Sequence, residues 1–424
     1  MRYIGIIILL VLCLTLLLLT GCRTNTVKPE PACENLENQE DINQSSNNSQ
    51  SSSTGQIYET VIADTEDTEM IYPQKWATGT GTASNPWAND CIKKAYNAVP
   101  TGGTIFLKAG YYQLADALVV QKSINIIGEG MDRTIIRTAD SHGFYVRKTD
   151  YVTIKGMTVD GTAQDEHKDG IWFDLCDYAI VEDIEVKNVS SFGLALDTNY
   201  SYFHNIYSHD NYEHGMHSCP EIVGRNTNNT FRDIYCWNNG LTTANSGFDM
   251  VGYESVDDTT VHNNVYDNIR CWDNGAMGIA LQYLDGCTLS NSVVSGNAGK
   301  GAYISLSKNM NIKNCDVFDN GEEGIGLYDL DDVNLTNVIS RNNNTLEDGY
   351  SGINIWGCSD IVMASCQSYD DKETPLQEYG IYVGDGNSTI TLLNCKLSPN
   401  KNGEIYDPTG AVVTVITDKM LAKF

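Results

Sequence analysis

Residues 278–300 read GIALQYLDGCTLSNSVVSGNAGK, and residues 301–323 read GAYISLSKNMNIKNCDVFDNGEE. Each 23-residue segment begins with a glycine and alternating apolar residues, continues with a second alternating run, and ends in a polar corner that contains asparagine. The same glycine-led pattern recurs along the chain at spacings of 22 to 32 residues. Its glycines are Gly170, Gly193, Gly215, Gly247, Gly278, Gly301, Gly324, Gly352 and Gly380.

A repeat of about 23 residues that holds three short strands predicts an all-β solenoid, a right-handed parallel β-helix of about 10–12 turns. Successive turns of such a helix stack about 4.8 Å apart. We therefore expect these glycines to form one column along the helix axis, the glycine column. Asparagines at the corners can form hydrogen-bonded ladders. A β-sandwich fits less well, because it needs antiparallel hairpins roughly every 8–12 residues.

A capping helix is expected before the first turn, since an open solenoid end would expose strand edges. Pro86 suits the first position of a helix. The apolar residues that follow at helical spacing are Trp87, Cys91, Ile92, Ala95 and Ala98.

Two motifs follow this helix: residues 101–112 (TGGTIFLKAGYY) and residues 124–130 (INIIGEG). The combination resembles the N-terminal part of the pectate-lyase-like superfamily, and the resemblance extends over roughly Trp76 to Thr417. It implies the β-helix fold, but a fold does not by itself determine the reaction.

The N-terminus is typical of an export signal. Residues 1–21 combine a charged start with a short apolar run, and Leu19-Thr20-Gly21-Cys22 resembles the lipobox of prokaryotic lipoproteins. We expect cleavage before Cys22, acylation of Cys22, and a protein tethered to the outer face of the cell membrane; an uncleaved N-terminal anchor is the alternative. Residues 22–70 then form a flexible polar linker, and residues 71–424 form the β-helix domain. Mass spectrometry of the mature N-terminus would test this.

Composition narrows the classes of partner. The 55 acidic and 27 basic residues give a net charge of −28, which argues against nucleic-acid binding. Apart from Cys13 and Cys22, 11 cysteines remain, and most of them lie inside short apolar runs. An exported protein can form disulfides, but the number is odd, so these cysteines are interpreted as small buried side chains.

The register predicts where ligands bind. If the first and third residues after each glycine point inward, the second points outward. Ionisable and aromatic outward residues concentrate in the turns between 170 and 253, and they include Trp172, His217 and Asp249. The longest insertions, 215–247 and 247–278, flank Asp249 and are expected to wall the site.

Histidine, which can transfer protons near neutral pH, clusters in the same place. The run 209–217 (HDNYEHGMH) contains three of the seven histidines. The candidate catalytic residues are therefore His217, His214, Tyr212, His209 and Asp249. Three imidazoles could also bind a metal, but no ligand motif identifies one, so the metal stays open.

Asp174 and Asp197 occupy equivalent positions on successive turns, which predicts a separation of roughly 5 Å. Such a pair can share a proton, hold a cation such as Ca²⁺, or act as the carboxylates of a retaining glycosidase. The alternative is that each carboxylate accepts backbone N–H bonds at a strand end. The candidate substrate-binding residues are Lys168, Trp172, Asp174, Asp197 and Tyr253.

A second resemblance concerns residues 212–217 (YEHGMH), 230–241 (TFRDIYCWNNGL) and 247–253 (GFDMVGY). They look like the catalytic stretch of mannuronan C5-epimerases, which carry Tyr-Gly-Phe-Asp-Pro-His followed by Arg-Asp, Asn-Gly-Leu and Gly-Phe segments. Matching by end residues places the family's Tyr on Tyr212 and its His on His217. Matching by the glycine register places its Tyr on His214, its Asp on His217 and its His on Cys219.

Three functions follow from these features. The first is a cell-surface lyase or C5-epimerase that abstracts the C5 proton of a uronic acid in a polysaccharide. In it His217 or His214 is the base, Tyr212 the acid, and Lys168, His209 or Ca²⁺ neutralises the substrate carboxylate. The second is a glycoside hydrolase that uses the paired aspartates, and the third is a non-catalytic glycan-binding adhesin.

Overall fold

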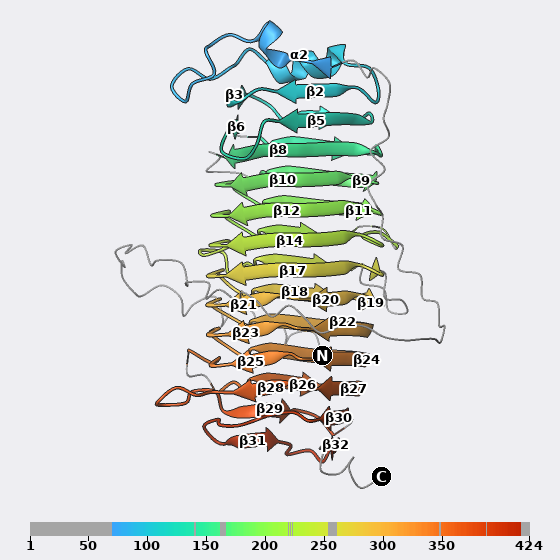
Figure 1. Ribbon diagram of the computed structural model, residues 1–424, viewed down its shortest axis with the longest axis vertical. Helices are drawn as coiled ribbons and strands as arrows, with labels where there is room; N and C mark the ends of the chain where they lie inside the picture. The colour runs from blue at the N-terminus through green and yellow to red at the C-terminus, as the bar shows by residue number, and fades with distance from the viewer. Residues whose placement is uncertain are drawn as a thin grey trace, which may run out of the picture. The chain divides into compact units, whose positions relative to one another are not determined.

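The computed structural model describes residues 70–139, 141–161, 167–218, 220, 222, 224–252, 261–346, 349–386 and 388–416. These residues wind into a parallel β-helix of about 12 turns (Figure 1). The predicted signal peptide, Cys22 and nearly all of the predicted linker lie outside the described residues. Within those residues, no helix has the length and apolar character needed to cross a membrane.

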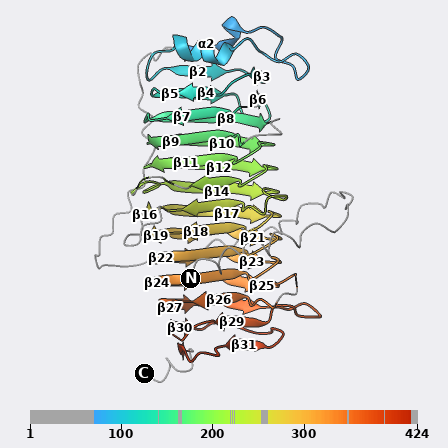
Figure 2. The same cartoon turned by 180° about the vertical axis from the view of Figure 1, so that it is seen from behind.

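The first face of the helix consists of the strands that follow the glycine column. Its strands pair in parallel, and the residues directly after the glycines keep the same register from turn to turn. Figure 2 shows the stacked strands from behind. They are β4 (Leu118–Val120), β7 (Phe144–Arg147), β9 (Ile171–Asp177), β11 (Leu194–Asn199), β13 (Met216–Ser218), β15 (Phe248–Val251), β18 (Ile279–Gln282), β22 (Ala302–Lys313), β24 (Ile325–Thr336), β26 (Ile353–Trp356), β29 (Tyr379–Val383) and β31 (Gly403–Tyr406).

The second face contains the longer strands, and several of them bend into the third face. Their bends lie at residues with positive φ, such as Asp183 and Asn205. The strands of the second face, besides parts of β22 and β24, are β1 (Met70–Ile71), β2 (Thr104–Leu107), β5 (Ile124–Gly128), β8 (Val152–Gly161), β10 (Ile180–Lys187), β12 (Tyr202–His209), β14 (Thr230–Trp237), β17 (Val265–Trp272), β20 (Thr288–Ser290), β27 (Ser359–Ala364), β30 (Thr389–Leu393) and β32 (Val412–Ile416).

The third face is completed by shorter strands. They are β3 (Gly110–Leu114), β6 (Thr134–Thr138), β21 (Val293–Ser295), β23 (Asp316–Phe318), β25 (Ile339–Arg341) and β28 (Gln367–Tyr369). A further pair, β16 (Val261–His262) and β19 (Leu284–Asp285), lies beside the main faces.

The glycine column is confirmed. From Gly170 to Gly324, the N–H of the residue after each glycine donates to the carbonyl of the next glycine along the axis, for example Leu194 to Gly215 and Met216 to Gly247. Strand register places Gly380 next in the column after Gly352. Glycine is required there because the turns approach closely: a Cβ on Gly193 would lie 2.5 Å from the carbonyl oxygen of Gly215. Gly143 extends the column by one turn that the sequence pattern did not include.

The predicted asparagine ladder is also present at the corner before the column. Each asparagine except the last, Asn343, donates from its backbone N–H and its Nδ2 to the next asparagine, as in Asn239 to Oδ1 of Asn274 at 3.1 Å for both bonds. These side chains are nearly inaccessible, so the ladder satisfies polar groups that would otherwise be costly to bury. Its members are Asn211, Asn239, Asn274, Asn297, Asn320 and Asn343.

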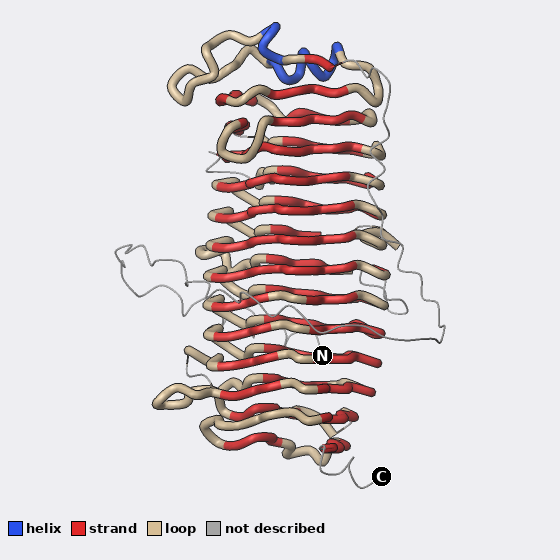
Figure 3. Tube along the Cα trace, in the orientation of Figure 1, coloured by secondary structure: helices blue, strands red, loops and turns tan. Residues whose placement is uncertain are grey.

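The N-terminal cap is shorter than predicted. The helix α2 runs from Cys91 to Ala98, so Pro86 and Trp87 precede it. Trp87 instead pairs with Tyr112 in an extended bridge, and the centroids of their rings lie 4.8 Å apart. A tertiary contact therefore holds Trp87 outside the helix, and Figure 3 shows α2 with the short 3₁₀ helix η1 (Pro73–Trp76) at that end.

The core is one continuous apolar stack of inward residues from all three faces. The nine cysteines in the described part of the chain are unpaired thiols, and all but Cys395 are buried. This agrees with their interpretation as small core side chains.

Candidate functional site

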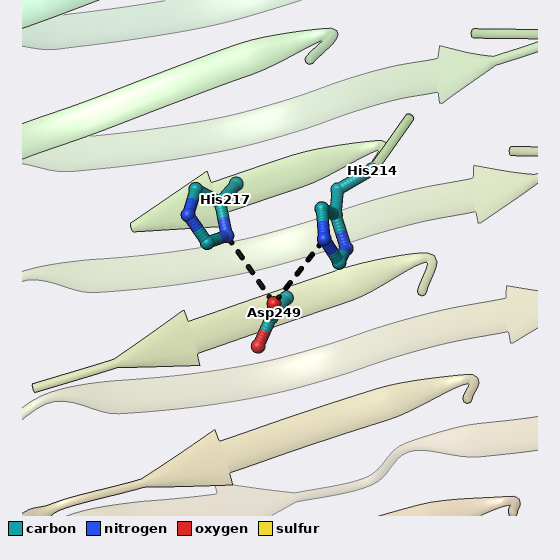
Figure 4. Close-up of side chains that lie close together, drawn as sticks. All are labelled: His214, His217 and Asp249. Carbon is teal, nitrogen blue, oxygen red and sulfur yellow. Dashed lines mark hydrogen bonds and ion pairs between the residues drawn. The ribbon is translucent and has the colours of Figure 1, made fainter. Parts of the chain in front are cut away.

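His214, His217 and Asp249 converge on the outer surface of the first face (Figure 4). His217 on β13 and Asp249 on β15 are register partners on adjacent turns, while His214 directly precedes Gly215. Oδ2 of Asp249 lies 3.2 Å from Nδ1 of His217 and 3.5 Å from Nε2 of His214. One carboxylate oxygen thus faces both imidazoles.

Hydrogen bonds assign the tautomer of each ring. The backbone N–H of Ser246 donates to Nδ1 of His214 at 3.1 Å, so a neutral His214 carries its proton on Nε2, which faces Asp249. Nδ1 of His217 faces the carboxylate at hydrogen-bonding distance, so it carries the proton and the Nε2 lone pair is on the opposite side of the ring. The two histidines therefore have different chemistry.

The site is more shielded than the expected exposed groove. The side chains of His214, His217 and Asp249 are only 14%, 18% and 10% exposed. Phe192, on the preceding turn, packs against both histidines, with ring centroids 5.5 Å and 4.5 Å away. Burial lowers the pKa of His214 to about 4, although Asp249 acts in the opposite direction. His214 is therefore neutral near pH 7.

This burial predicts a characteristic pH dependence of stability. Between pH 6.5 and about 4 the unfolded chain protonates His214 while the folded protein does not, so stability falls as the pH falls. His214→Gln should remove about 3 kcal/mol of this acid-dependent loss of unfolding free energy. Urea unfolding at pH 7.5 and pH 4 measures it, and equal losses in parent and variant would contradict the prediction.

His209 provides a control, because its pKa is shifted in the opposite direction to that of His214. Burial lowers its pKa, but the carboxylates of Asp210 and Glu185 raise it by more, so the net shift is upward. Its stabilising contribution is present below pH 6.5 and is lost as the pH rises through the raised pKa. His209→Gln should therefore not reduce the acid loss.

The cluster does not fit a bound metal, although its three candidate ligand atoms lie within 4.8 Å of one another. Nδ1 of His214 already accepts a backbone N–H, so neutral Nε2 is protonated and has no lone pair for a cation. Ca²⁺ in addition prefers a shell of oxygen ligands. The arrangement is suited to proton transfer instead.

The structure does not bring His209 to this cluster. His209 ends β12 on another face, where its ring stacks on Trp237 at 3.9 Å. Its nitrogens lie 2.6 Å from Asp210 and 3.0 Å from Glu185. A carboxylate at each nitrogen favours the imidazolium form of His209, which pairs with both acidic side chains at this corner.

The other predicted residues surround the cluster at different distances. Tyr212 is 52% exposed at the corner before it and, within the described part of the chain, forms no hydrogen bond with the cluster. Lys168 is half-buried two turns earlier. Trp172 lies two turns earlier as well, on the outer surface, and its ring stacks on Tyr145 at 4.3 Å. Tyr253 lies outside the described residues.

Asp174 and Asp197 are held by different partners. Asp174 accepts from Arg147 at 3.1 Å and from the hydroxyl of Tyr145 at 2.9 Å. Asp197 pairs with Arg225 at 2.5 Å. Burial raises the pKa of Asp197, and Arg225 opposes that shift. Each carboxylate thus has its own guanidinium partner.

Sequence reasoning missed Phe192 and Ser246, which position the histidines. Both occupy the place immediately before a column glycine, as His214 does. The same register could have identified them, but only as neighbours of the site.

Comparisons with known proteins place this geometry in context. A family model described as a right-handed beta helix region matches residues 242–357 and 267–418. No curated protein sequence matches the chain significantly.

Several solved structures share the fold at low sequence identity. The A-module of the Azotobacter vinelandii mannuronan C-5 epimerase AlgE6 has a TM-score of 0.63 at 17% identity, over 82% of this chain and 98% of that chain. The catalytic unit of an alpha-1,3-glucanase from Streptomyces thermodiastaticus has a TM-score of 0.53 at 15% identity, over 84% and 68%. The Streptococcus pneumoniae surface adhesin PfbA has a TM-score of 0.54 at 10% identity, over 83% and 94%. The chain therefore contains a right-handed β-helix region, and its fold resembles those of mannuronan C5-epimerases and other β-helix carbohydrate enzymes.

Proposed function

We propose that this protein is a polysaccharide-modifying enzyme that abstracts the C5 proton of a uronic acid residue, leading to β-elimination or C5 epimerisation. The observation that carries the proposal is the shared carboxylate oxygen of Asp249, which orients one histidine as a base beside a second histidine held neutral. The fold shared with a mannuronan epimerase supports the substrate class.

His217 is the base in this proposal. Asp249 accepts a hydrogen bond from Nδ1–H of His217. This bond leaves the lone pair on Nε2, on the side of the ring away from the carboxylate, and Asp249 stabilises the imidazolium that forms when Nε2 is protonated. The C5 proton passes to Nε2, and the electron pair of the broken C–H bond delocalises into the adjacent substrate carboxylate.

His214 acts as a neutral donor. A neutral imidazole N–H can polarise an oxygen on which charge develops, provided that burial keeps the ring uncharged. Nε2 of His214 carries such a proton, because Nδ1 accepts a hydrogen bond from the backbone N–H of Ser246. In this proposal the substrate carboxylate receives a hydrogen bond from His214, in place of the neutralising charge that the sequence analysis assigned to Lys168, His209 or Ca²⁺.

Two outcomes complete the reaction. In elimination, the carbanion expels the oxygen at C4, a C4–C5 double bond forms, and the leaving oxygen takes up a proton from water. In epimerisation, a proton from water returns to C5 from the opposite face, and His217 releases the abstracted proton to solvent. A hydrolase is favoured less, because the cluster contributes a single carboxylate and the Asp174 and Asp197 carboxylates have arginine partners.

The test incubates the purified protein with mannuronan and with polygalacturonate, with and without Ca²⁺. Ultraviolet absorbance from an unsaturated uronic acid is expected for elimination, and deuterium incorporation at C5 in D₂O is expected for epimerisation. New reducing ends without absorbance would instead indicate hydrolysis. Binding with none of these products would contradict the proposal and favour an adhesin.

A further inference from the structure

Outward side chains of the first face form a continuous column that runs through the candidate site. Strand register places them one per turn in the order Trp172, Ala195, His217, Asp249, Ala280 and Tyr303. An aromatic residue thus lies two turns before His217 and another lies two turns after Asp249. Five steps of about 4.8 Å separate these two aromatic residues by about 24 Å along the axis.

The aromatic residue on the N-terminal side belongs to a small rigid group, the N-terminal shelf, formed by Tyr145, Trp172, Asp174 and Arg147. The two rings stack at 4.3 Å with an interplanar angle of 14°. The hydroxyl of Tyr145 donates to Asp174 at 2.9 Å, and Arg147 pairs with the same carboxylate oxygen. Both rings are half-buried, so each keeps an accessible surface.

The C-terminal side has a related arrangement, the C-terminal shelf, formed by Tyr303, Tyr328, Glu323 and Lys300. Its rings lie 5.3 Å apart and are tilted by 38°. The hydroxyl of Tyr328 donates to Glu323 at 2.6 Å, and Lys300 lies 2.7 Å from the same oxygen. In both shelves a phenol is held by a carboxylate that is itself paired with a basic residue.

A glycine makes the second shelf possible. A Cβ on Gly326 would lie 2.5 Å from the ring of Tyr328 and 2.9 Å from Oε1 of Glu323. The absence of a side chain at this outward position therefore lets the Tyr328 ring lie against the sheet and reach a carboxylate that is fully buried. Such a ring has little conformational freedom to lose when a ligand binds.

The paired charges restrict what the shelves can recognise. Arg147 and Lys300 are each neutralised by a carboxylate, and Lys300 also pairs with Glu322 at 2.9 Å. Neither basic group is left without a carboxylate partner, so the shelves offer ring surfaces rather than free positive charge to a ligand. The apolar face of a sugar ring packs on an aromatic ring through dispersion and burial of apolar area.

We infer that the two shelves are sugar-binding subsites, which hold an extended polysaccharide along the helix axis so that an internal residue of the chain lies at His217. The inference rests on the proposed function for the identity of the reacting residue. It adds that flanking sugars are bound through their ring faces, and that the protein acts within chains rather than at their ends.

The test is retardation in native gels that contain mannuronan, polygalacturonate or a neutral glucan, with the catalytically impaired His217→Ala variant as the parent. At least one polysaccharide should retard it, and Trp172→Ala or Tyr303→Ala should weaken that binding about tenfold. Trp172→Phe should preserve most of it. Retardation should persist at 0.5 M salt, since dispersion contacts are not screened as charge contacts are.

Tyr235→Ala is the matched control, because Tyr235 is a half-buried aromatic residue that stacks on Tyr207 at 4.7 Å on another face. It should leave binding unchanged. The inference is overturned if no polysaccharide in the panel retards the parent, or if both shelf variants bind as tightly as the parent. Shelf-dependent binding without turnover by the protein that retains His217 would refute the proposed function alone. Turnover by that protein with shelf-independent binding would refute the shelves alone.

Discussion

His217→Ala is expected to reduce turnover of the uronan substrate by about 10³-fold, because it removes the group that accepts the C5 proton. The effect should fall on kcat more than on KM, as expected when a transition-state interaction is lost. The folded protein should lose about 1–2 kcal/mol of unfolding free energy, because His217 lies outside the core but packs on Phe192 and pairs with Asp249. Steady-state kinetics and urea unfolding measure the two effects.

His204→Ala is the matched control for this prediction. His204 also lies beside carboxylates, 3.1 Å from Asp233, but on β12 and a different face, so its loss should leave turnover unchanged. Asp249→Asn should reproduce the loss of activity, because an amide cannot favour the same tautomer of His217. Full activity of the His217 variant on an identified substrate would refute the site assignment.

Gly193→Ala is expected to cost about 3 kcal/mol of unfolding free energy, a large fraction of the stability of a typical domain. The added Cβ would lie 1.9 Å from Oγ of Ser208 and 2.5 Å from the carbonyl oxygen of Gly215. Ser208 is itself bonded to that carbonyl and to Asn211, so relief of the clash disturbs the asparagine ladder. Urea unfolding and thermal melting measure the loss.

Gly386→Ala tests whether the effect is specific to the column. A Cβ there would lie 3.1 Å from the carbonyl oxygen of Thr409, which belongs to an exposed C-terminal loop that can shift. A cost of no more than about 1 kcal/mol is expected. Equal destabilisation by both substitutions would mean that close packing of the column is not what selects glycine.

The sequence predicted the glycine column and the asparagine ladder because both depend on an interaction that repeats with every turn. Residues one turn apart in the sequence are also neighbours in space. The spacing of Gly278 and Gly301 in the sequence therefore predicts that they lie next to each other. The register further predicted that His217 and Asp249 would be adjacent outward residues, and they are.

The local pattern misled where a tertiary contact competed with it. Pro86 and Trp87 match the start of a helix, but pairing with Tyr112 holds Trp87 in an extended conformation. His209 and His214 are five residues apart, yet they lie on different faces because the chain turns between them at Asp210, whose φ is 55°. At that corner, the closeness of His209 and His214 in the sequence therefore does not predict that they are close in space.

The sequence by itself determined the solenoid, its register, and the turns on which His217, Asp249 and Trp172 lie. Only the tertiary structure decided the chemistry of the site. Ser246 fixes the His214 tautomer and Phe192 shields the ring, and both come from other turns. The physical reason is that backbone register repeats by sterics and hydrogen bonding, whereas tautomers, charge pairing and shielding depend on the particular side chains that neighbouring turns bring together.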